Sequence, residues 1–411
     1  MMGSGATRLK RRGRRWNVRI NRAHRYELDP NVVQFTLLAK HAGVARFAYN
    51  WGLARRIALW EQEKKCTNAI EQHRELNRLK RTEFPWMYEV SKCAPQEALR
   101  DLDRAFRNFF RGLKTGRKVG FPKFKRKWRR DSFRLTGVIR VLERHVQLPR
   151  LGNVRVKETT AVRGRILSAT VSREADRWFV SLTVEQEIAD PEPVAGPAVG
   201  IDVGLTHFAT VVGSDGEVVK VEPPKPLNRY LKLLRRRQRK HSRKQKGSHN
   251  RQKSALRLAR LHRRIRNIRG DFLHKLSTEL AKTKSVIAVE DLNVSGLLKN
   301  KSFARHIADV GWAEFRRQLG YKTGLYRSRL VVANRFFPSS KTCSACGAVQ
   351  DRMAVDVREW ICPECAKRHD RDVDAARNLL ALVGQASLPG VPRKVTPVDI
   401  GGFSPLGGAG A

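Results

Sequence analysis

The hydrophobic pattern of the N-terminal part of the chain changes period twice. Residues 8–29 alternate polar and apolar side chains, which is typical of one or two strands. From about 31 to 113 the period becomes helical, and we assign Phe109 and Phe110, on the apolar face, to the core. Residues 117–188 return to short alternating runs separated by turn residues. The pattern predicts a β module interrupted by a helical insertion.

A second pattern begins after the Pro-rich run IADPEPVAGPA, which is typical of a linker. Apolar runs predict strands at GIDVGLTHFATVV, near 217–222, at SVIAVE and at RLVVANRFF. Between them lie helical stretches, including residues 229–270, where GSHN turns one helix into the next, and a last helix starts at about 372. This order of strands and helices is typical of an RNase H-like domain.

Three acidic residues stand at places that suit metal-dependent chemistry. Asp202 lies in AVGIDVGLTHFAT, Glu290 ends the run SVIAVEDL, and Asp372 opens the last helix. Carboxylates are the ligands that Mg²⁺ prefers, and a pair of Mg²⁺ ions needs them from separate elements. Gly200 and Gly204 flank Asp202 and permit a close approach of backbone or substrate. Each acid alone is more typical of a cap or turn; together they predict a nuclease site.

Four cysteines form two CxxC pairs separated by 15 residues: Cys343, Cys346, Cys362 and Cys365. This spacing is typical of a zinc ribbon, in which two tight turns close one tetrahedral, structural Zn²⁺ site. His369 follows closely, and we interpret it as a turn or substrate contact rather than a fifth ligand. Cysteines in this pattern favour a reducing cytoplasm over a disulfide scaffold.

Charge identifies the class of partner. Lys and Arg number 84 against 38 Asp and Glu, and residues 229–270 carry 18 of these basic residues and no acid. Such an excess favours binding to a polyanion, and the lack of a long apolar span or secretory signal argues against a membrane. We therefore predict a cytoplasmic, nucleoid-associated protein that binds nucleic acid. The alternative is that the basic segment is only a solvated charged surface.

Basic and hydroxyl side chains in three segments are the predicted nucleic-acid contacts: Lys123, Lys125, Arg126, Arg235, Arg236, Arg237, Arg239, Lys240, Ser339, Ser340 and Lys341. Aromatic side chains among basic residues are candidates for stacking on bases, although each alone is more often part of a core. These are Trp16, Phe121, Phe124 and Trp128.

The chain resembles the TnpB family, transposon-encoded RNA-guided nucleases related to type V CRISPR effectors. The matching segments include GVARFAYNWGLA, VGFPKFK, VGIDVGLTHFA, EDLNV, GWAEFRRQLGYK and, most specifically, FPSSKTCSACG followed by CPEC and HDRD. They span about residues 26–380, nearly the whole chain.

The resemblance implies an α+β multidomain fold. A wedge β-barrel (1–30 and 118–190) would be interrupted by a helical recognition lobe (31–117). An RNase H-like RuvC nuclease (191–342 and 367–383) would follow, with the Cys₄ zinc ribbon inserted at 343–366. The last 28 residues, 384–411, are rich in Gly and Pro, which predicts a disordered tail.

The resemblance also implies the roles of the acids. Asp202, Glu290 and Asp372 would be the catalytic carboxylates, with Asp370 as the rival third ligand. The family's D-x-N-A-A pattern reads DVDAA here, so that Asp374 replaces the usual Asn and would add charge near the metals.

The implied function is RNA-guided, Mg²⁺-dependent cleavage of target DNA next to a short flanking motif. The implied partners are a guide RNA from the end of the transposable element and double-stranded target DNA, bound by a monomer. Three alternatives remain open: a guide-directed DNA-binding repressor without cleavage, a guide-free transposase, and a compact type V CRISPR effector. The intact acidic triad argues against the repressor.

Overall fold

The structure, a computed structural model, describes residues 8–12, 15–117, 119–127, 129–354 and 357–385. The chain divides into two compact units. The N-terminal unit comprises Asn17–Ile188, and the C-terminal unit begins at Ala189. The predicted stacking residue Trp128 lies outside the described residues.

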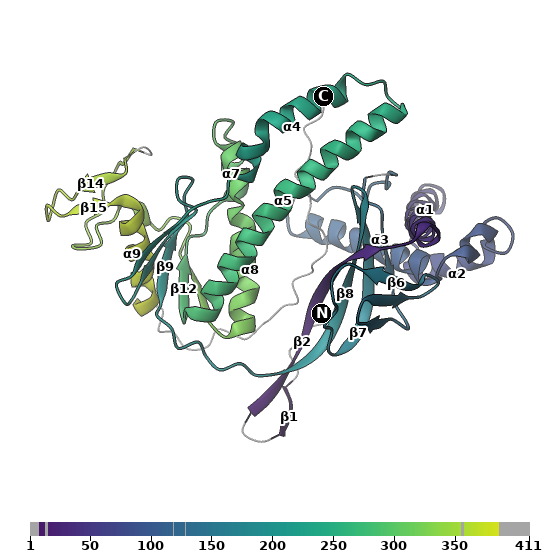
Figure 1. The fold of residues 1–411 in the computed structure, drawn as a ribbon, viewed down its shortest axis with the longest axis horizontal. Helices are drawn as coiled ribbons and strands as arrows, with labels where there is room; N and C mark the ends of the chain where they lie inside the picture. The colour runs from purple at the N-terminus through teal and green to yellow at the C-terminus, as the bar shows by residue number, and fades with distance from the viewer. Residues whose placement is uncertain (1–7, 13–14, 118, 128, 355–356, 386–411) are drawn as a thin grey trace. The chain divides into compact units, whose positions relative to one another are not determined.

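One sheet organises the N-terminal unit (Figure 1). Its path is β3-β7-β8-β2-β6-β5-β4, and β1 pairs with β2 outside this path. The strands are β1 (Arg8–Arg12), β2 (Arg15–Asp29), β3 (Ser132–Leu135), β4 (Arg140–Leu142), β5 (His145–Leu148), β6 (Gly152–Val156), β7 (Arg165–Glu174) and β8 (Arg177–Ala189). Because β2 lies between β8 and β6, strands from before and after the helical insertion share one sheet, as the sequence pattern predicts.

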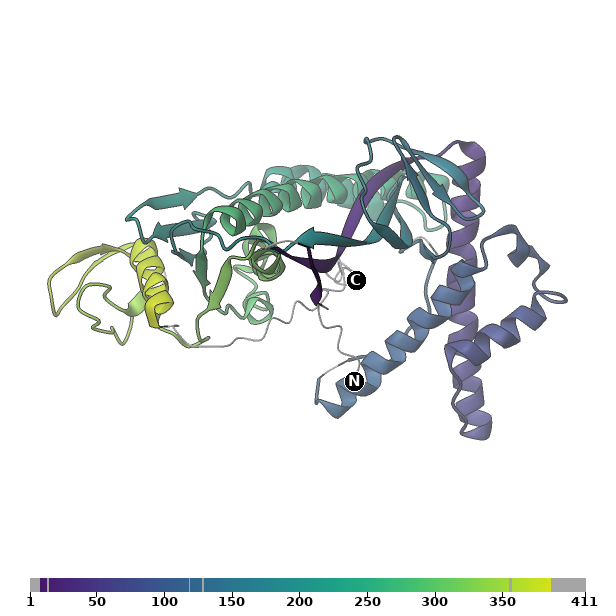
Figure 2. The same cartoon turned by 90° about the horizontal axis from the view of Figure 1, so that it is seen from below.

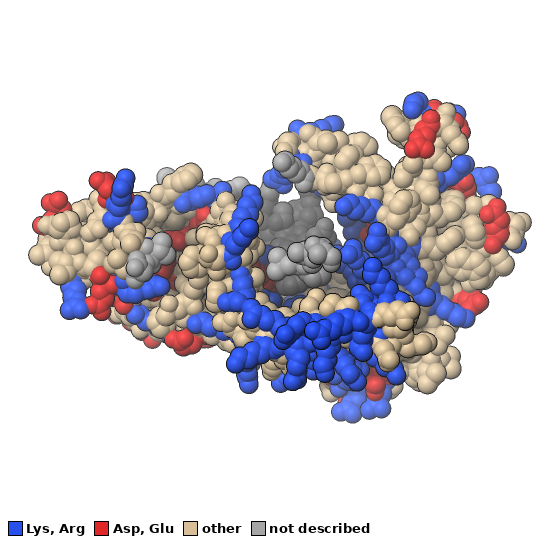
Figure 3. Space-filling view, turned by 90° about the horizontal axis from the view of Figure 1, so that it is seen from above, with Lys and Arg blue, Asp and Glu red and all other residues tan. Residues whose placement is uncertain are grey.

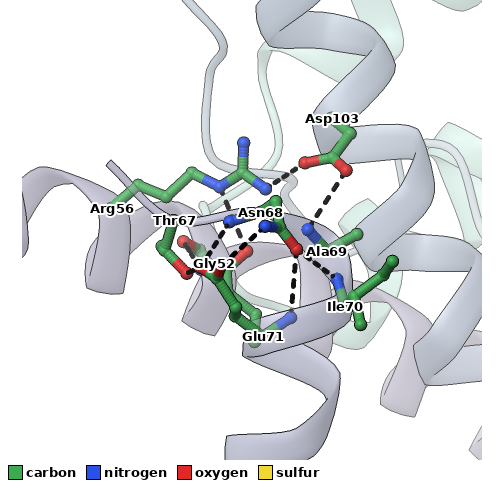
Figure 4. Close-up of polar contacts among 9 residues, drawn as sticks. Gly52, Arg56, Thr67, Asn68, Ala69, Ile70, Glu71 and Asp103 are labelled. Atoms are coloured by element: carbon green, nitrogen blue, oxygen red, sulfur yellow. Dashed lines mark hydrogen bonds and ion pairs between the residues drawn. The ribbon is translucent and has the colours of Figure 1, made fainter. Parts of the chain in front are cut away.

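The insertion consists of α1 (Val32–Glu63), α2 (Ala69–Leu79), a short 3₁₀ turn (Pro85–Glu89) and α3 (Cys93–Lys114). A Cβ on Gly52 would lie 2.6 Å from Leu99 Cδ2, so that the glycine lets α1 and α3 pack closely. Polar contacts fix the start of α2 at the same junction (Figure 4). Asn68 accepts from the N–H of Glu71, and Asp103 accepts from the N–H of Ala69 and from Arg56.

The core assignment of Phe110 is wrong. This side chain is 54% exposed, whereas Phe109 is half-buried. Both lie near the end of α3 in an aromatic cluster with Phe106 and Phe121. The helical period places Phe110 close to the apolar face, but the core residues of α3 end with Leu102, well before this turn.

A mixed five-stranded sheet forms the centre of the C-terminal unit, in the order β11-β10-β9-β12-β13. Its strands are β9 (Val199–Asp202), β10 (Ala209–Gly213), β11 (Val218–Val221), β12 (Val286–Val289) and β13 (Arg329–Val332). β10 is antiparallel to β9 and β11, whereas β9, β12 and β13 are mutually parallel. All five strands lie where the apolar runs predict them.

Helices cover both faces of this sheet (Figure 1, and turned in Figure 2). α5 (His249–Thr283) and α8 (Trp312–Tyr326) bury Val199 and Ile201 on one face. On the other face lies α9 (Arg371–Gln385), whose backbone comes so close that a Cβ on Gly200 would meet the carbonyl oxygen of Ala376 at 2.0 Å. The expected close approach at Gly200 is therefore made by α9 itself.

The basic segment forms a helical hairpin of α4 (Pro226–Ser242) and α5, with the turn at the predicted GSHN. Leu261 and Ile265 on α5 are buried, which confirms the apolar stripe. Asp309, at the end of α7 (Ala304–Val310), accepts from the first N–H groups of α4, those of Leu227 and Asn228, at 2.8 and 2.9 Å. Lys and Arg side chains gather in a band in the space-filling view (Figure 3).

The sequence pattern did not predict α7 or the short helix α6 (Val294–Leu297). None of the helices within the described ranges is long and apolar enough to cross a bilayer.

Candidate active site and metal centre

Two of the three predicted acids stand at the ends of adjacent parallel strands. The last aligned pair of β9 and β12 is Ile201 and Val289. Asp202 directly follows Ile201, and Glu290 directly follows Val289. Side chains alternate between the faces of a sheet, and Ile201 and Val289 both pack toward α5 and α8. Asp202 and Glu290 therefore belong to the opposite face, the one that α9 covers.

The third acid lies at the start of α9, and the structure separates its two candidates. Asp370 caps this helix: its Oδ1 accepts from the N–H of Asp372 and of Val373, both at 3.1 Å, and its Oδ2 accepts from Lys220 at 2.7 Å. Although burial alone would raise the pKa of Asp370, Lys220 and the two N–H groups lower it. Asp372 lies 3.6 Å from Arg358 across a partly exposed ion pair. Both Asp370 oxygens therefore have partners within the protein.

The charges of Glu290 and Asp372 both act on Asp202. Burial, followed by the negative charges of Glu290 and Asp372, raises the pKa of Asp202 well above its ordinary range. Arg371 and the N–H of Val203 oppose this shift without cancelling it. A half-buried group of three carboxylates has the donor chemistry of a divalent cation site.

Glu290 and its neighbour are held by residues far along the chain. The Ser339 hydroxyl donates to Glu290 Oε1, and Asp291 pairs with Arg316 and with Arg335. Ser339 is only 2% exposed, so its predicted nucleic-acid contact has no support from its position. Sequence reasoning missed the bond to Glu290, because 49 residues separate the two and only the SSK motif marks the serine.

The four cysteines gather as the spacing predicts. Their sulfur atoms all lie within 4.8 Å of one another, and Cys343–Cys365 and Cys346–Cys362 are each 3.6 Å apart. A Zn–S bond of about 2.3 Å in a tetrahedron places sulfurs about 3.8 Å apart, which fits these distances. Over the described ranges, no other set of three or more His, Cys, Asp or Glu ligand atoms converges in this way.

Local backbone shapes the two turns of this cluster. Cys343 accepts from the N–H of Gly347 and Cys362 from that of Ala366, each at 2.9 Å, and both donors have positive φ. The N–H of Cys365 is the main cause that lowers the pKa of the Cys362 thiol to about 7. Although the N–H of Ala348 opposes it, desolvation and the other three thiols raise the pKa of Cys346 to about 12. Four thiolates therefore need a dication to coexist, and the residues present fit zinc.

His369 and Asp374 connect the cysteine cluster to α9. His369 Nε2 lies 3.1 Å from Cys343 Sγ, and His369 Nδ1 lies 2.9 Å from Asp374 Oδ1. His369 is 2% exposed and stacks on Trp360, so a substrate contact is excluded. Asp374, 1% exposed, also accepts from the N–H of Ser344. The charge of Asp374 thus faces the ribbon and not the acids around Asp202, contrary to expectation.

The other predicted nucleic-acid contacts fall into two groups. Exposed side chains belong to Lys123, Lys125, Arg126, Arg235, Arg236, Arg239 and Lys240. The second group is half-buried, and two of its side chains bond within the protein. Arg237 donates to the carbonyl of Arg257, and Lys341 donates to the carbonyl of Asp351. Ser340 is half-buried. Phe121 and Phe124 are exposed, as base stacking requires.

Three family models match the chain. One, described as "Probable transposase", matches residues 179–301, and a "Cas12f1-like, TNB domain" matches residues 312–379. A "Helix-turn-helix domain" matches residues 20–65, over which the structure forms the end of β2 and the single helix α1. The first two models together cover the sheet, the acids and the cysteine cluster.

Relatives extend over nearly the full chain. A protein of Streptomyces pristinaespiralis named "Putative RNA-guided DNA endonuclease" is 39% identical over 379 residues, covering 88% of this chain and 89% of the relative. "TnpB-like protein L79" of Acanthamoeba polyphaga mimivirus is 30% identical and covers 44% of this chain and 36% of the relative. A solved "mini-RNA-guided endonuclease", CRISPR-Cas_phi3, covers 90% of this chain and 93% of that chain at 10% identity and a TM-score of 0.45. That likeness is too distant to carry a conclusion.

Proposed function

The chain belongs to the TnpB family of RNA-guided DNA endonucleases, and from this premise we propose that it hydrolyses phosphodiester bonds of DNA at sites selected by a bound guide RNA. One observation carries the proposal: Glu290 at the end of β12 and Asp372 on α9 both act electrostatically on Asp202 of β9, on a chain of formal charge +46. A protein that only binds nucleic acid has no use for uncompensated acids beside phosphates.

The catalytic residues are then Asp202, Glu290 and Asp372, in a RuvC-like unit of RNase H type. The strand order β11-β10-β9-β12-β13, with β10 antiparallel to both of its neighbours, supports this class. The three carboxylates would hold two Mg²⁺ ions, which supply an activated water and stabilise the leaving oxygen. The protein's part is to hold the three carboxylates in place, and α9 and the strand ends do so by close packing at Gly200.

The division of labour along the chain follows. Residues 1–30 and 118–190 form the wedge domain and 31–117 the helical lobe. Residues 191–342 and 367–383 form the nuclease, with the ribbon at 343–366. The common sheet of β2, β6 and β8 supports the first division, and the cysteine cluster between β13 and α9 supports the second. The predicted tail, 384–411, lies outside the described residues from 386 on.

Two metals and two nucleic acids are the partners of this function. Zinc in the Cys₄ cluster is structural, because all four ligand positions are filled by thiolates. Guide RNA and target DNA bind through phosphates, for which the exposed side chains of α4 and of the Lys123–Arg126 segment are suited. The protein acts as a monomer.

The guide is tested by expressing the protein together with its native flanking DNA and sequencing the RNA that co-purifies. We expect one discrete RNA from the element's end with a short variable 3′ segment. Repeat-derived RNA would reassign the protein to the CRISPR effectors. Heterogeneous RNA that salt removes, together with cleavage at element ends, would favour the guide-free transposase. The match to the "Probable transposase" family model is the observation in favour of this alternative.

Cleavage with that RNA tests the site. Asp202→Ala and Asp372→Ala each lower the cleavage rate by more than about 100-fold, because loss of a ligand costs more than loss of an outer partner. Both keep guide and target binding in a mobility-shift assay. The control is Asp370→Ser, which keeps an N-cap acceptor for α9 but removes the carboxylate, and it retains cleavage. Loss of cleavage in Asp370→Ser with full activity in Asp372→Ala would reverse the assignment.

A further inference from the structure

A buried serine touches one of the proposed catalytic carboxylates. Ser339 begins the 3₁₀ turn Ser339–Lys341, which lies between β13 and the cysteine cluster. Its hydroxyl donates to Oε1 of Glu290. A glutamate side chain has three rotatable bonds, and a donor at one carboxylate oxygen restricts them while leaving the second oxygen available to an ion.

The backbone of the serine is itself fixed from α9. Asn378 Nδ2 donates to the carbonyl of Ser339 at 2.8 Å and to that of Thr342 at 2.7 Å. Asn378 is 7% exposed; its bond to Ser339 is buried and its bond to Thr342 is partly buried. The N–H of Ser339 donates to the carbonyl of Phe337 at 2.9 Å, which completes the constraint on the turn.

These bonds make one continuous path between elements that carry the acids. Glu290 follows β12, Ser339 holds Glu290, and Asn378 holds Ser339 from the same helix that bears Asp372. We propose that Ser339 is a positioning residue, which sets the orientation of the Glu290 carboxylate relative to α9 and thereby the affinity of the acidic site for divalent cations. This inference rests on the proposed function of the acids and assigns Ser339 a role other than contact with nucleic acid.

Residues that hydrogen-bond to metal ligands affect metal affinity without touching the metal. A carboxylate that binds an ion is oriented by hydrogen bonds to its other positions, and loss of such a partner costs about 10–100-fold in metal affinity or activity. Because Ser339 is buried, water cannot readily replace its hydroxyl in Ser339→Ala. A nucleic-acid contact would instead change binding of RNA or DNA and leave cation affinity as it is.

The test measures cation affinity in two ways. Mn²⁺ binding to the full-length protein without nucleic acid is followed by electron paramagnetic resonance, with Asp202→Ala defining the signal of the acids. Single-turnover cleavage by the guide-loaded protein is then titrated with Mg²⁺. We expect Ser339→Ala to weaken Mn²⁺ binding and to raise the half-saturating Mg²⁺ concentration, each by about 10–100-fold. Ser339→Thr, which keeps the hydroxyl, restores most of the affinity.

The control is Ser277→Ala, which removes an equally buried hydroxyl on α5 that bonds Gln318 and no acid. It lowers the melting temperature without changing cation affinity.

If Ser339→Ala does not fold, Asn378→Ala gives the same test from the other end of the path. Unchanged Mn²⁺ and Mg²⁺ affinities in a folded variant would overturn the proposal. If the wild type binds Mn²⁺ through Asp202 but does not cut, the proposed function fails while the Mn²⁺ comparison still decides the role of Ser339.

Discussion

At the scale of single residues, contacts between distant segments hold the candidate acids: Ser339 donates to Glu290, and Asp370 caps the helix that carries Asp372. Asp202 and Glu290 stand out because a charge that ends an apolar strand is unusual, and the helical start at Asp372 completes the set. The resemblance favours Asp372 over Asp370 as the third ligand, and the structure adds that Asp370 caps α9. The roles of Ser339, His369 and Asp374 depend on contacts between segments distant in sequence, which no local pattern encodes.

The raised pKa of Asp202 makes the stability of the metal-free protein depend on pH. A carboxyl whose pKa is raised by folding favours the folded state at low pH, and this contribution is lost as pH rises through the folded-state pKa. In EDTA, the melting temperature therefore falls as pH rises above the ordinary carboxyl range. Asp202→Asn removes the charge and raises stability at pH 8 by about 0.5–2 kcal/mol, a shift of a few degrees.

Thermal scans in EDTA at pH 5 and pH 8 measure this effect. The difference in melting temperature between wild type and Asp202→Asn is small at pH 5 and larger at pH 8. Addition of Mg²⁺ reduces this difference, because the ion stabilises only the wild type. An Asp215→Asn variant, at an exposed turn after β10, serves as the control for loss of one negative charge. A difference in melting temperature that is independent of pH would show that folding does not raise the pKa of Asp202.

At the scale of elements, periodicity predicts the long helices and every strand of the five-stranded sheet. It succeeds for α5 because Leu261 and Ile265 recur on one face, and for the ribbon because CxxC spacing fixes two turns. It fails for α6 and α7, which are too short to show a period, and for Phe110, where the period continues past the end of the buried surface. The sequence pattern does not tell which helix covers which face of the sheet; the close packing of α9 on Gly200 identifies the face that α9 covers.

The ribbon and α9 are linked by His369, and this link affects zinc retention. His369→Ala removes the ring beside the Cys343 sulfur, and we expect the protein's zinc affinity to fall by about 10–100-fold. Asp374→Asn, which keeps an oxygen near His369 Nδ1, gives a smaller loss. Release of zinc to a chromophoric chelator measures both.

The matched control is His41→Ala in the N-terminal unit, because His41 is equally buried and bonds only backbone groups, the carbonyl of Leu37 and the N–H of Ser91. It costs stability without speeding zinc release. Equal release rates for wild type and His369→Ala would leave His369 as a core residue with no effect on the metal.

At the scale of the whole molecule, charge sets how nucleic acid is bound. A formal charge of +46 predicts a steep loss of affinity with salt, since each phosphate contact releases counterions. Composition predicts this property well, but only the structure separates exposed side chains such as Arg235 and Arg236 from Arg237, which bonds its own hairpin. The class of nucleic acid follows from family membership and not from charge.

The exposed face of α4 gives a quantitative test. Arg235→Gln with Arg236→Gln lowers the slope of log affinity against log salt by about 1.4–1.8, because each contact contributes about 0.7–0.9. Filter binding of the guide RNA at several salt concentrations measures the slope. Arg368→Gln, in which the lost arginine pairs with Glu359 on the ribbon, leaves the slope unchanged. An unchanged slope in the double variant would place the RNA elsewhere.

The contact between Gly200 and α9 has a consequence for biosynthesis. β9 leaves the ribosome early, but the helix that packs on it, and brings Asp372 to Asp202, is made 170 residues later. At about 5–20 residues per second, roughly 10–30 s separate the two events. During that interval the helical insertion and the basic hairpin are complete while the acids are still apart. The basic hairpin, the predicted RNA contact, is therefore made before the helix that completes the proposed nuclease site.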